Sequence, residues 1–101
     1  MSKTILITGA SSGIGKTTAR YFHDKGWNVI ATMRKPDDET ELTSLDNVLV
    51  ARLDVQDEES IHAAVAEGIE RFGAIDVLLN NAGYGAYGVL EATPMAKAER
   101  Q

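Results

Sequence analysis

Residues 5–22, ILITGASSGIGKTTARYF, place a glycine-rich turn between an apolar run and an amphipathic stretch. The apolar run contains β-branched residues, as expected for a strand that is buried on both faces. The stretch after the turn has helical spacing of its apolar residues. The first amides of a helix are free, and the helix dipole favours an anion there. The turn therefore predicts an α/β fold with a phosphate site at the end of its first strand.

The same turn allows two interpretations of the phosphate. Residues 10–17, ASSGIGKT, nearly match a P-loop, in which Lys16 would bind the terminal phosphates. Ala10 occupies the position of the first P-loop glycine, however, and Arg52 interrupts the strand that would supply a magnesium ligand. Residues 8–15, TGASSGIG, fit a dinucleotide-binding turn instead. The turn by itself leaves both interpretations open.

Apolar runs and amphipathic stretches alternate along the chain, which is typical of a parallel sheet covered by helices. The strands are expected at Thr4–Thr8, Asn28–Met33, Val48–Leu53 and Ile75–Asn80, and the helices from Gly13 to Lys25 and from Glu58 to Phe72. Right-handed crossovers give the strand order 3-2-1-4. The predicted fold class is α/β, a Rossmann-type doubly wound parallel sheet whose fourth strand is an apolar edge.

Local patterns add details to this expectation. Ile14, Thr18 and Phe22 are expected to form the core-facing stripe of the first helix. Asp57 is placed to cap the second helix, and the segment between the second and third strands reads as a loop that can contain one turn of helix. Thr93 and Pro94 predict the start of a further helix that has no partner within the sequence. Residues 1–101 are therefore expected to be the N-terminal part of a single dinucleotide-binding domain, truncated here.

Composition limits the class of protein. The 101 residues are 44% hydrophobic and carry a formal net charge of -5, which argues against a nucleic-acid-binding surface. There is no cysteine, so disulfides and thiolate metal sites are excluded. No apolar run is long enough to span a membrane, and the first residues do not read as a signal peptide. We therefore expect a soluble cytoplasmic protein with no metal site and no nucleic-acid or membrane partner.

Three motifs follow one another at the ends of predicted strands: TGASSGIG at residues 8–15, LDV at 53–55 and NNAG at 80–83. Together they resemble the short-chain dehydrogenase/reductase (SDR) family over essentially the whole chain. The resemblance implies an NAD(P)-dependent oxidoreductase that transfers a hydride between the nicotinamide and a small carbonyl or alcohol substrate. It also implies that the full-length protein forms a homo-oligomer.

The resemblance assigns cofactor-binding roles residue by residue. The pyrophosphate and the adenosine ribose would be lined by Gly9, Ser11, Ser12, Ile14 and Gly15. The adenine would be bound by Asp54 and by the amide of Val55, and the adenosine ribose and the nicotinamide side would lie over Asn81, Ala82 and Gly83. An asparagine of the last motif is also expected to reach the first strand near Thr8.

The end of the second strand bears on the choice between NADP and NAD. A site that prefers NAD usually has an acid there, but Thr32 occupies the position and Arg34 and Lys35 follow it. Because a guanidinium can hold a 2′-phosphate with two hydrogen bonds, the sequence favours NADP(H), with Arg34 as its ligand. The alternative is that these cations are solvated loop charges beside Asp37 and its acidic neighbours, and NAD is then possible.

Catalytic residues are not assigned within this sequence. In the family a tyrosine, a lysine four residues later and a serine perform the proton chemistry. Tyr21 and Lys25 have that spacing, but they fall on the first helix and are interpreted as surface residues. Tyr84 and Tyr87 could touch the substrate. The catalytic residues are therefore expected beyond Gln101, and the chain alone is expected to be inactive. The alternatives are a non-catalytic NADP-binding or sensing protein and a P-loop nucleotidase.

Overall fold

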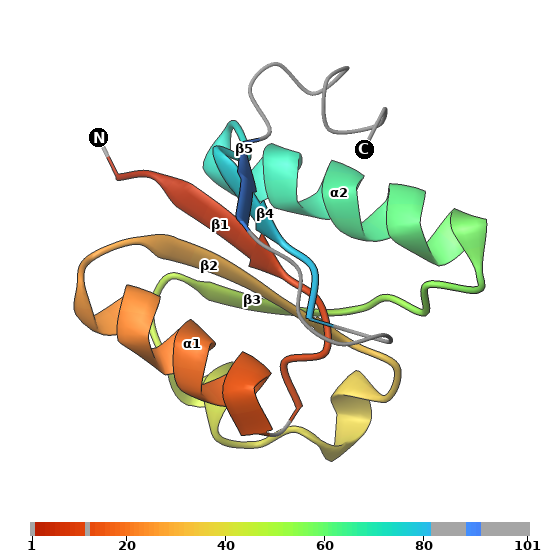
Figure 1. Cartoon of the computed structure of the whole chain (residues 1–101), viewed down its shortest axis with the longest axis horizontal. Coiled ribbons are helices and arrows are strands. Elements are labelled where there is room, and N and C mark those ends of the chain that lie inside the picture. The colour runs from red at the N-terminus through yellow and green to blue at the C-terminus, as the bar shows by residue number, and fades with distance from the viewer. Residues whose placement is uncertain (1, 12, 82–88, 92–101) are drawn as a thin grey trace.

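The computed structural model describes residues 2–11, 13–81 and 89–91. Its elements are β1 (Thr4–Ile7), α1 (Gly13–Asp24), β2 (Asn28–Met33), the short 3-10 helices η1 (Pro36–Asp38) and η2 (Leu42–Ser44), β3 (Val48–Arg52), α2 (Glu58–Phe72), β4 (Val77–Leu79) and β5 (Val89–Glu91). The strands form one sheet in the order β3-β2-β1-β4-β5, with α1 on one face and α2 on the other (Figure 1). No helix in the described ranges is both long and apolar enough to cross a bilayer.

The predicted order 3-2-1-4 of parallel strands is confirmed, with β1 between β2 and β4. The prediction that the fourth strand forms an edge is wrong, because β5 pairs with it in antiparallel register, Leu78 opposite Leu90. This pairing occupies the backbone groups that a bare edge would expose. A strand of only three residues after a glycine-rich segment gives too short a pattern to be recognised in the sequence.

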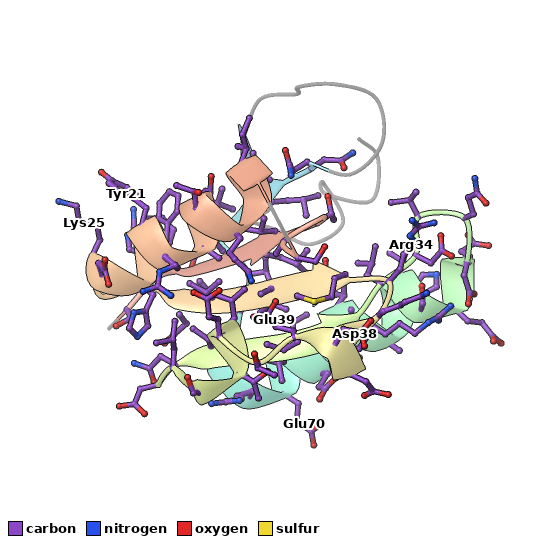
Figure 2. The ribbon with its side chains drawn as sticks, turned by 90° about the horizontal axis from the view of Figure 1, so that it is seen from below. Tyr21, Lys25, Arg34, Asp38, Glu39 and Glu70 are labelled. Carbon is purple, nitrogen blue, oxygen red and sulfur yellow. The ribbon has the colours of Figure 1, made fainter. Side chains whose placement is uncertain are left out.

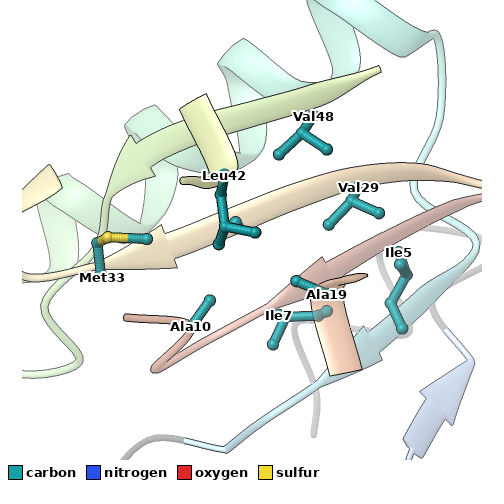
Figure 3. Close-up of a cluster of buried hydrophobic side chains, with 9 residues drawn as sticks. Ile5, Ile7, Ala10, Ala19, Val29, Met33, Leu42 and Val48 are labelled. Carbon is teal, nitrogen blue, oxygen red and sulfur yellow. The ribbon is translucent and has the colours of Figure 1, made fainter. Parts of the chain in front are cut away.

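Alternate residues of the strands face opposite helices. Ile5 and Ile7 belong to the core cluster on the α1 side, whereas Leu6 belongs to the cluster on the α2 side. The strand β2 repeats the pattern, since Val29 joins the first cluster and Ile30 the second. Figure 3 shows the cluster on the α1 side. Because both faces of the sheet are covered, its strands read as continuous apolar runs in the sequence.

The core-facing stripe of α1 differs from the predicted one. Ile14 is 74% exposed, so its assignment to the core was wrong. The buried residues of α1 are Gly15 and Ala19, and Phe22 packs partly against the same cluster. Because Gly15 has no side chain and Ala19 has only a methyl group, the backbone of α1 can lie close to the sheet. The buried face is therefore rotated by about one residue from the predicted stripe, and Ile14 stands in solvent beside the glycine turn.

The helix α2 begins and ends where the sequence predicts. Ala64 is buried, and Ile61, Val65, Ile69 and Phe72 pack around it in the second cluster. Gly68 is also buried, and a Cβ at this position would overlap the Cδ1 atom of Ile30. The backbone of α2 thus lies directly against β2 at Gly68.

The structure confirms the predicted position of Asp57 in front of α2 but not a capping hydrogen bond from its side chain. Asp57 occupies the N-cap position, but its side chain makes no capping hydrogen bond. Its carboxylate instead accepts a hydrogen bond from Arg52 at 3.1 Å, and the guanidinium lowers the pKa of Asp57. The Ser60 hydroxyl donates to the carbonyl oxygen of Asp57 at 2.7 Å. After Arg52, the backbone amides of Ser60 and Glu59 in the first turn of α2 also lower the pKa of this carboxylate.

Candidate dinucleotide-binding site

The first four strands are parallel, so their carboxyl ends meet at one edge of the sheet. Gly9, Arg34, Asp54 and Asn81 follow β1, β2, β3 and β4 respectively. In open α/β sheets, ligands bind beyond the carboxyl ends of the strands, where the chain order reverses. Here that reversal lies between β1 and β4, beside the glycine turn.

The turn after β1 requires glycine for two different reasons. Gly9 and Gly13 have φ angles of 66° and 60°, a region that side chains with a Cβ rarely adopt. Gly15 is needed for close approach, because a Cβ there would overlap the carbonyl oxygen of Gly9 and lie 2.8 Å from Nδ2 of Asn81. The N-terminus of α1 is thus packed onto the segments after β1 and β4.

Thr8 joins those two segments by hydrogen bonds. Its hydroxyl donates to Oδ1 of Asn80 at 2.9 Å and accepts from the backbone amide of Asn81 at 2.8 Å. The side-chain amide of Asn81 donates to the carbonyl oxygen of Gly9 at 3.2 Å. The expected asparagine contact with the first strand near Thr8 is confirmed. The contact fixes the glycine turn relative to the end of β4.

Asp54 is positioned by a residue that the sequence patterns did not single out. The Ser60 hydroxyl accepts a hydrogen bond from the Asp54 amide at 2.9 Å and lies 3.1 Å from its carbonyl oxygen. The Asp54 carboxylate accepts from the Gln56 amide at 3.0 Å, and Val55 is 45% exposed. A serine in the first turn of a helix, three residues after the N-cap, is the signal that could have pointed to this contact.

The end of β2 presents no carboxylate of its own. Thr32 is fully buried, and its hydroxyl donates to the carbonyl oxygen of Ile7 at 2.8 Å. Its carbonyl oxygen accepts from the Ala10 amide at 3.0 Å, which ties the glycine turn to β2. Arg34 is exposed and makes no ion pair within the described residues. The cation at this edge is therefore open to an anion from solvent.

The comparison with known families decides between the two interpretations of the turn. The model of the short chain dehydrogenase family matches residues 3–101. The chain belongs to this family. The match covers nearly the whole sequence and all three motifs, and it gives no support to a P-loop nucleotidase.

Individual relatives agree with this assignment. An uncharacterized oxidoreductase of Schizosaccharomyces pombe is 40% identical over 97% of this chain and 33% of its own length. The 2-(R)-hydroxypropyl-CoM dehydrogenase of Xanthobacter autotrophicus is 41% identical over 99% of this chain and 44% of its own length. The chain therefore spans less than half the length of these curated relatives.

Solved structures of reductases resemble the fold described above. The 3-ketoacyl-(acyl-carrier-protein) reductase of Brucella melitensis, complexed with NADH, is 36% identical with a TM-score of 0.76, over 82% of this chain and 35% of its own. The menthone neomenthol reductase of Mentha piperita is 32% identical with a TM-score of 0.74, over 83% of this chain and 32% of its own.

Lys16 of this short-chain dehydrogenase chain, the residue that a P-loop would aim at phosphate, is paired with carboxylates. Its ammonium lies 3.2 Å from Oε1 of Glu39 and 3.1 Å from Oε1 of Glu41. Arg20, one turn later on α1, lies 3.1 Å from Oε2 of Glu41. The pairing of Lys16 with these carboxylates was not predicted from the sequence. Glu39 and Glu41 lie in an irregular segment, where the spacing of residues in the sequence does not predict which way their side chains point.

Glu39 is the buried member of the cluster, with a side chain only 3% exposed. Its second carboxylate oxygen accepts a hydrogen bond from the Leu42 amide at 2.8 Å, at the start of η2. Burial by itself would raise the pKa of Glu39, but the Leu42 amide and the Lys16 ammonium outweigh it and hold the pKa below its usual value. Glu41 and then Glu39 raise the pKa of Lys16, which stays charged.

The lowered pKa of Glu39 predicts a pH-dependent contribution to stability. A lowered pKa in the folded state stabilises the fold above the unfolded value of about 4.5, and this is lost as pH falls through the folded value. Glu39→Gln should therefore lower the free energy of unfolding near pH 7, with a deficit that shrinks below pH 4.5. Urea unfolding at several pH values measures this. Glu70→Gln, at an exposed α2 site on the other face, is the control (Figure 2). A deficit that is the same at every pH would contradict the prediction.

Tyr21 and Lys25 do not form part of the site. Lys25 Nζ lies 5.5 Å from the centroid of the Tyr21 ring, near the C-terminus of α1. Figure 2 shows the pair at the opposite end of the molecule from Arg34. This placement agrees with their interpretation as surface residues of the helix rather than as the family's tyrosine and lysine.

Some predicted residues lie outside the described part of the chain. Ser12, Ala82, Gly83, Tyr84, Tyr87, Thr93 and Pro94 belong to this group. Ser11 is described and lies exposed in the glycine turn. In residues 2–11, 13–81 and 89–91, no cluster of acidic, histidine or cysteine side chains is arranged to hold a metal ion.

Proposed function

We propose that this chain is the cofactor-binding N-terminal part of a short-chain dehydrogenase/reductase domain that uses NADP(H). The full-length protein would be an oxidoreductase acting on a small carbonyl or alcohol substrate. The observation that carries the proposal is the meeting of the glycine turn, Asp54 and Asn81 at the carboxyl edge of one parallel sheet. A dinucleotide can extend along such an edge, with its pyrophosphate at the N-terminus of α1.

The described residues fit a dinucleotide. The turn at Gly9 and Gly13 adopts the backbone conformation that a phosphate-binding loop needs, and no side chain at Gly15 stands between α1 and Asn81. We assign the pyrophosphate and ribose to Gly9, Ser11, Ser12, Ile14 and Gly15, the adenine to Asp54 and Val55, and the nicotinamide side to Asn81, Ala82 and Gly83. When bound, NADP(H) would donate or accept the hydride, and these residues would hold and orient it.

Arg34 supports NADP(H) over NAD(H). It follows β2 directly and is unpaired within the described residues, and Thr32 is buried where an NAD-preferring site would present an acid. An unpaired guanidinium and a missing carboxylate both favour a 2′-phosphate. The Brucella melitensis relative was solved with NADH, so NAD(H) is the alternative that a measurement must exclude.

The names of the relatives favour an enzyme over a non-catalytic sensing protein, since they are oxidoreductases, dehydrogenases and reductases. The groups that perform the proton chemistry would lie beyond Gln101 in the full-length protein. Its homo-oligomeric state and cytoplasmic location stay predictions. Finding a Tyr-x-x-x-Lys motif in the downstream sequence would support the enzyme, and its absence would favour the sensing protein.

Arg34→Ala is expected to weaken NADPH binding about 10- to 100-fold, because it removes a charge-assisted hydrogen-bond donor to the 2′-phosphate. NADH lacks that phosphate, so its Kd should change by less than about twofold. Fluorescence titration of the full-length protein with each cofactor measures both values. Arg71→Ala on α2, where the guanidinium lies over the Phe72 ring, is the matched control. An unchanged ratio of the two Kd values in Arg34→Ala would reject NADP(H) as the preferred cofactor.

A further inference from the structure

The segment that carries Arg34 is unfavourable for phosphate by its own charge. Residues 34–46 contain two bases and five acids, so the segment alone would repel an anion. Two of those acids are paired with cations of α1, since Lys16 lies within 3.2 Å of Glu39 and 3.1 Å of Glu41. Arg20 completes the cluster at 3.1 Å from Glu41. The net charge of the segment that carries Arg34 therefore depends on α1 as well as on the segment itself.

The Glu39 carboxylate is held beside α1 and cannot turn into solvent. Its side chain is almost fully buried, and one carboxylate oxygen is held by the amide of Leu42. Leu42 is fully buried in the same core cluster as Ala19 of α1. The packing thus fixes a negative charge close to α1, and only the Lys16 ammonium lies within ion-pair distance of it among the described residues.

We propose that Lys16 and Arg20 are specificity-determining residues for NADP(H), acting by neutralising Glu39 and Glu41. With these two carboxylates paired, Arg34 and Lys35 face three remaining acids of residues 34–46 instead of five, so the segment repels the 2′-phosphate less than it would alone. This inference rests on the proposed function, because it concerns the same cofactor site. Lys16 and Arg20 act through the two glutamates and make no contact with the cofactor themselves.

The first test is Lys16→Met, with NADPH and NADH titrated into the full-length protein by fluorescence. The Kd for NADPH should rise about three- to tenfold, as expected for an uncompensated charge near a phosphate, and the Kd for NADH should change little. The effect should shrink in about 1 M salt, where the Debye length falls to about 3 Å. Lys25→Met removes the same charge from the other end of α1 and should change neither Kd.

The second test separates action through the glutamates from direct contact with phosphate. In Lys16→Met/Glu39→Gln/Glu41→Gln, the unpaired carboxylates are gone, so the NADPH Kd should return to within about twofold of the original value. Glu41→Gln alone should tighten NADPH binding, since it leaves Lys16 and Arg20 with less negative charge to balance. If the triple variant binds NADPH as weakly as Lys16→Met does, or if Glu41→Gln binds it more weakly than the original, the inference is overturned.

The outcomes also distinguish this inference from the proposed function. If Arg34→Ala lowers the preference for NADPH and Lys16→Met does not, the inference fails and the function stands. If Arg34→Ala leaves the preference unchanged, the proposed NADP(H) site itself fails. Thermal unfolding of each variant checks its fold. If Lys16→Met does not fold, Glu41→Gln alone tests the inference. The Glu41 side chain is 57% exposed, and the effect expected from this substitution is tighter NADPH binding.

Discussion

Gly15→Ala is expected to weaken dinucleotide binding more than tenfold and to lower the free energy of unfolding by about 1–3 kcal/mol. The added Cβ would overlap the Gly9 carbonyl oxygen, which is backbone and cannot rotate away. It would also lie 2.8 Å from the Asn81 side-chain amide that donates to that same oxygen. The N-terminus of α1 must then move away from the glycine turn and from the end of β4, where the pyrophosphate would lie.

Both effects of Gly15→Ala are measurable on the full-length protein, by NADPH fluorescence titration and by urea unfolding. Gly26→Asn is a suitable control, because Gly26 has a positive φ but, unlike Gly15, no atom within 4 Å of an added Cβ. Asparagine tolerates the φ of 88° found at Gly26, and Gly26 lies beyond the C-terminal end of α1, away from the glycine turn. If Gly15→Ala bound NADPH with unchanged affinity, the close packing of Gly15 against Gly9 and Asn81 would not be needed for cofactor binding.

Gly68→Val should lower the free energy of unfolding by about 1–3 kcal/mol while leaving the cofactor-binding edge intact. A Cβ at Gly68 would overlap Cδ1 of Ile30 and lie 3.1 Å from its Cγ1. Ile30 is fully buried, so its side chain has little space to adjust. Valine is the sharper test than alanine, because the gain in helix propensity from Gly to Ala is about 1 kcal/mol and would hide part of the steric cost.

The matched control for Gly68→Val is Ala66→Val, at an exposed position of the same helix. It introduces the same β-branched side chain without any contact with the sheet. Urea unfolding should show a loss of less than about 1 kcal/mol for this control. If the two variants lost the same stability, helix propensity rather than packing against Ile30 would explain the result.

Much of the fold followed from periodicity. The bounds of β2 and α2 and the order of the first four strands were predicted, because apolar runs of parallel strands and the amphipathic pattern of α2 are long enough to recognise. The contact of an asparagine of the last motif with the first strand near Thr8 followed from the resemblance, and the hydrogen bond between Thr8 and Asn80 confirms it. These are properties of local pattern and of topology, which a sequence records directly.

The parts that were missed depend on side-chain direction and on distant contacts. The spacing of Ile14, Thr18 and Phe22 is as helical as that of the residues that are buried, and only the sheet decides which face turns inward. Glu39 lies in a segment without periodicity, so neither its burial nor its pairing with Lys16 could be derived. The strand β5 is recognisable only through its partner, β4.

A competition titration of the full-length protein with NADPH, NADH and Mg-ATP shows which nucleotide the glycine turn binds. The turn at residues 9–15 is proposed to hold a dinucleotide, and Lys16 is occupied by Glu39 and Glu41 rather than open to a terminal phosphate. We expect saturable NADPH binding, weaker NADH binding and no displacement of NADPH by Mg-ATP at similar concentration. Tight Mg-ATP binding without NADPH binding would contradict it.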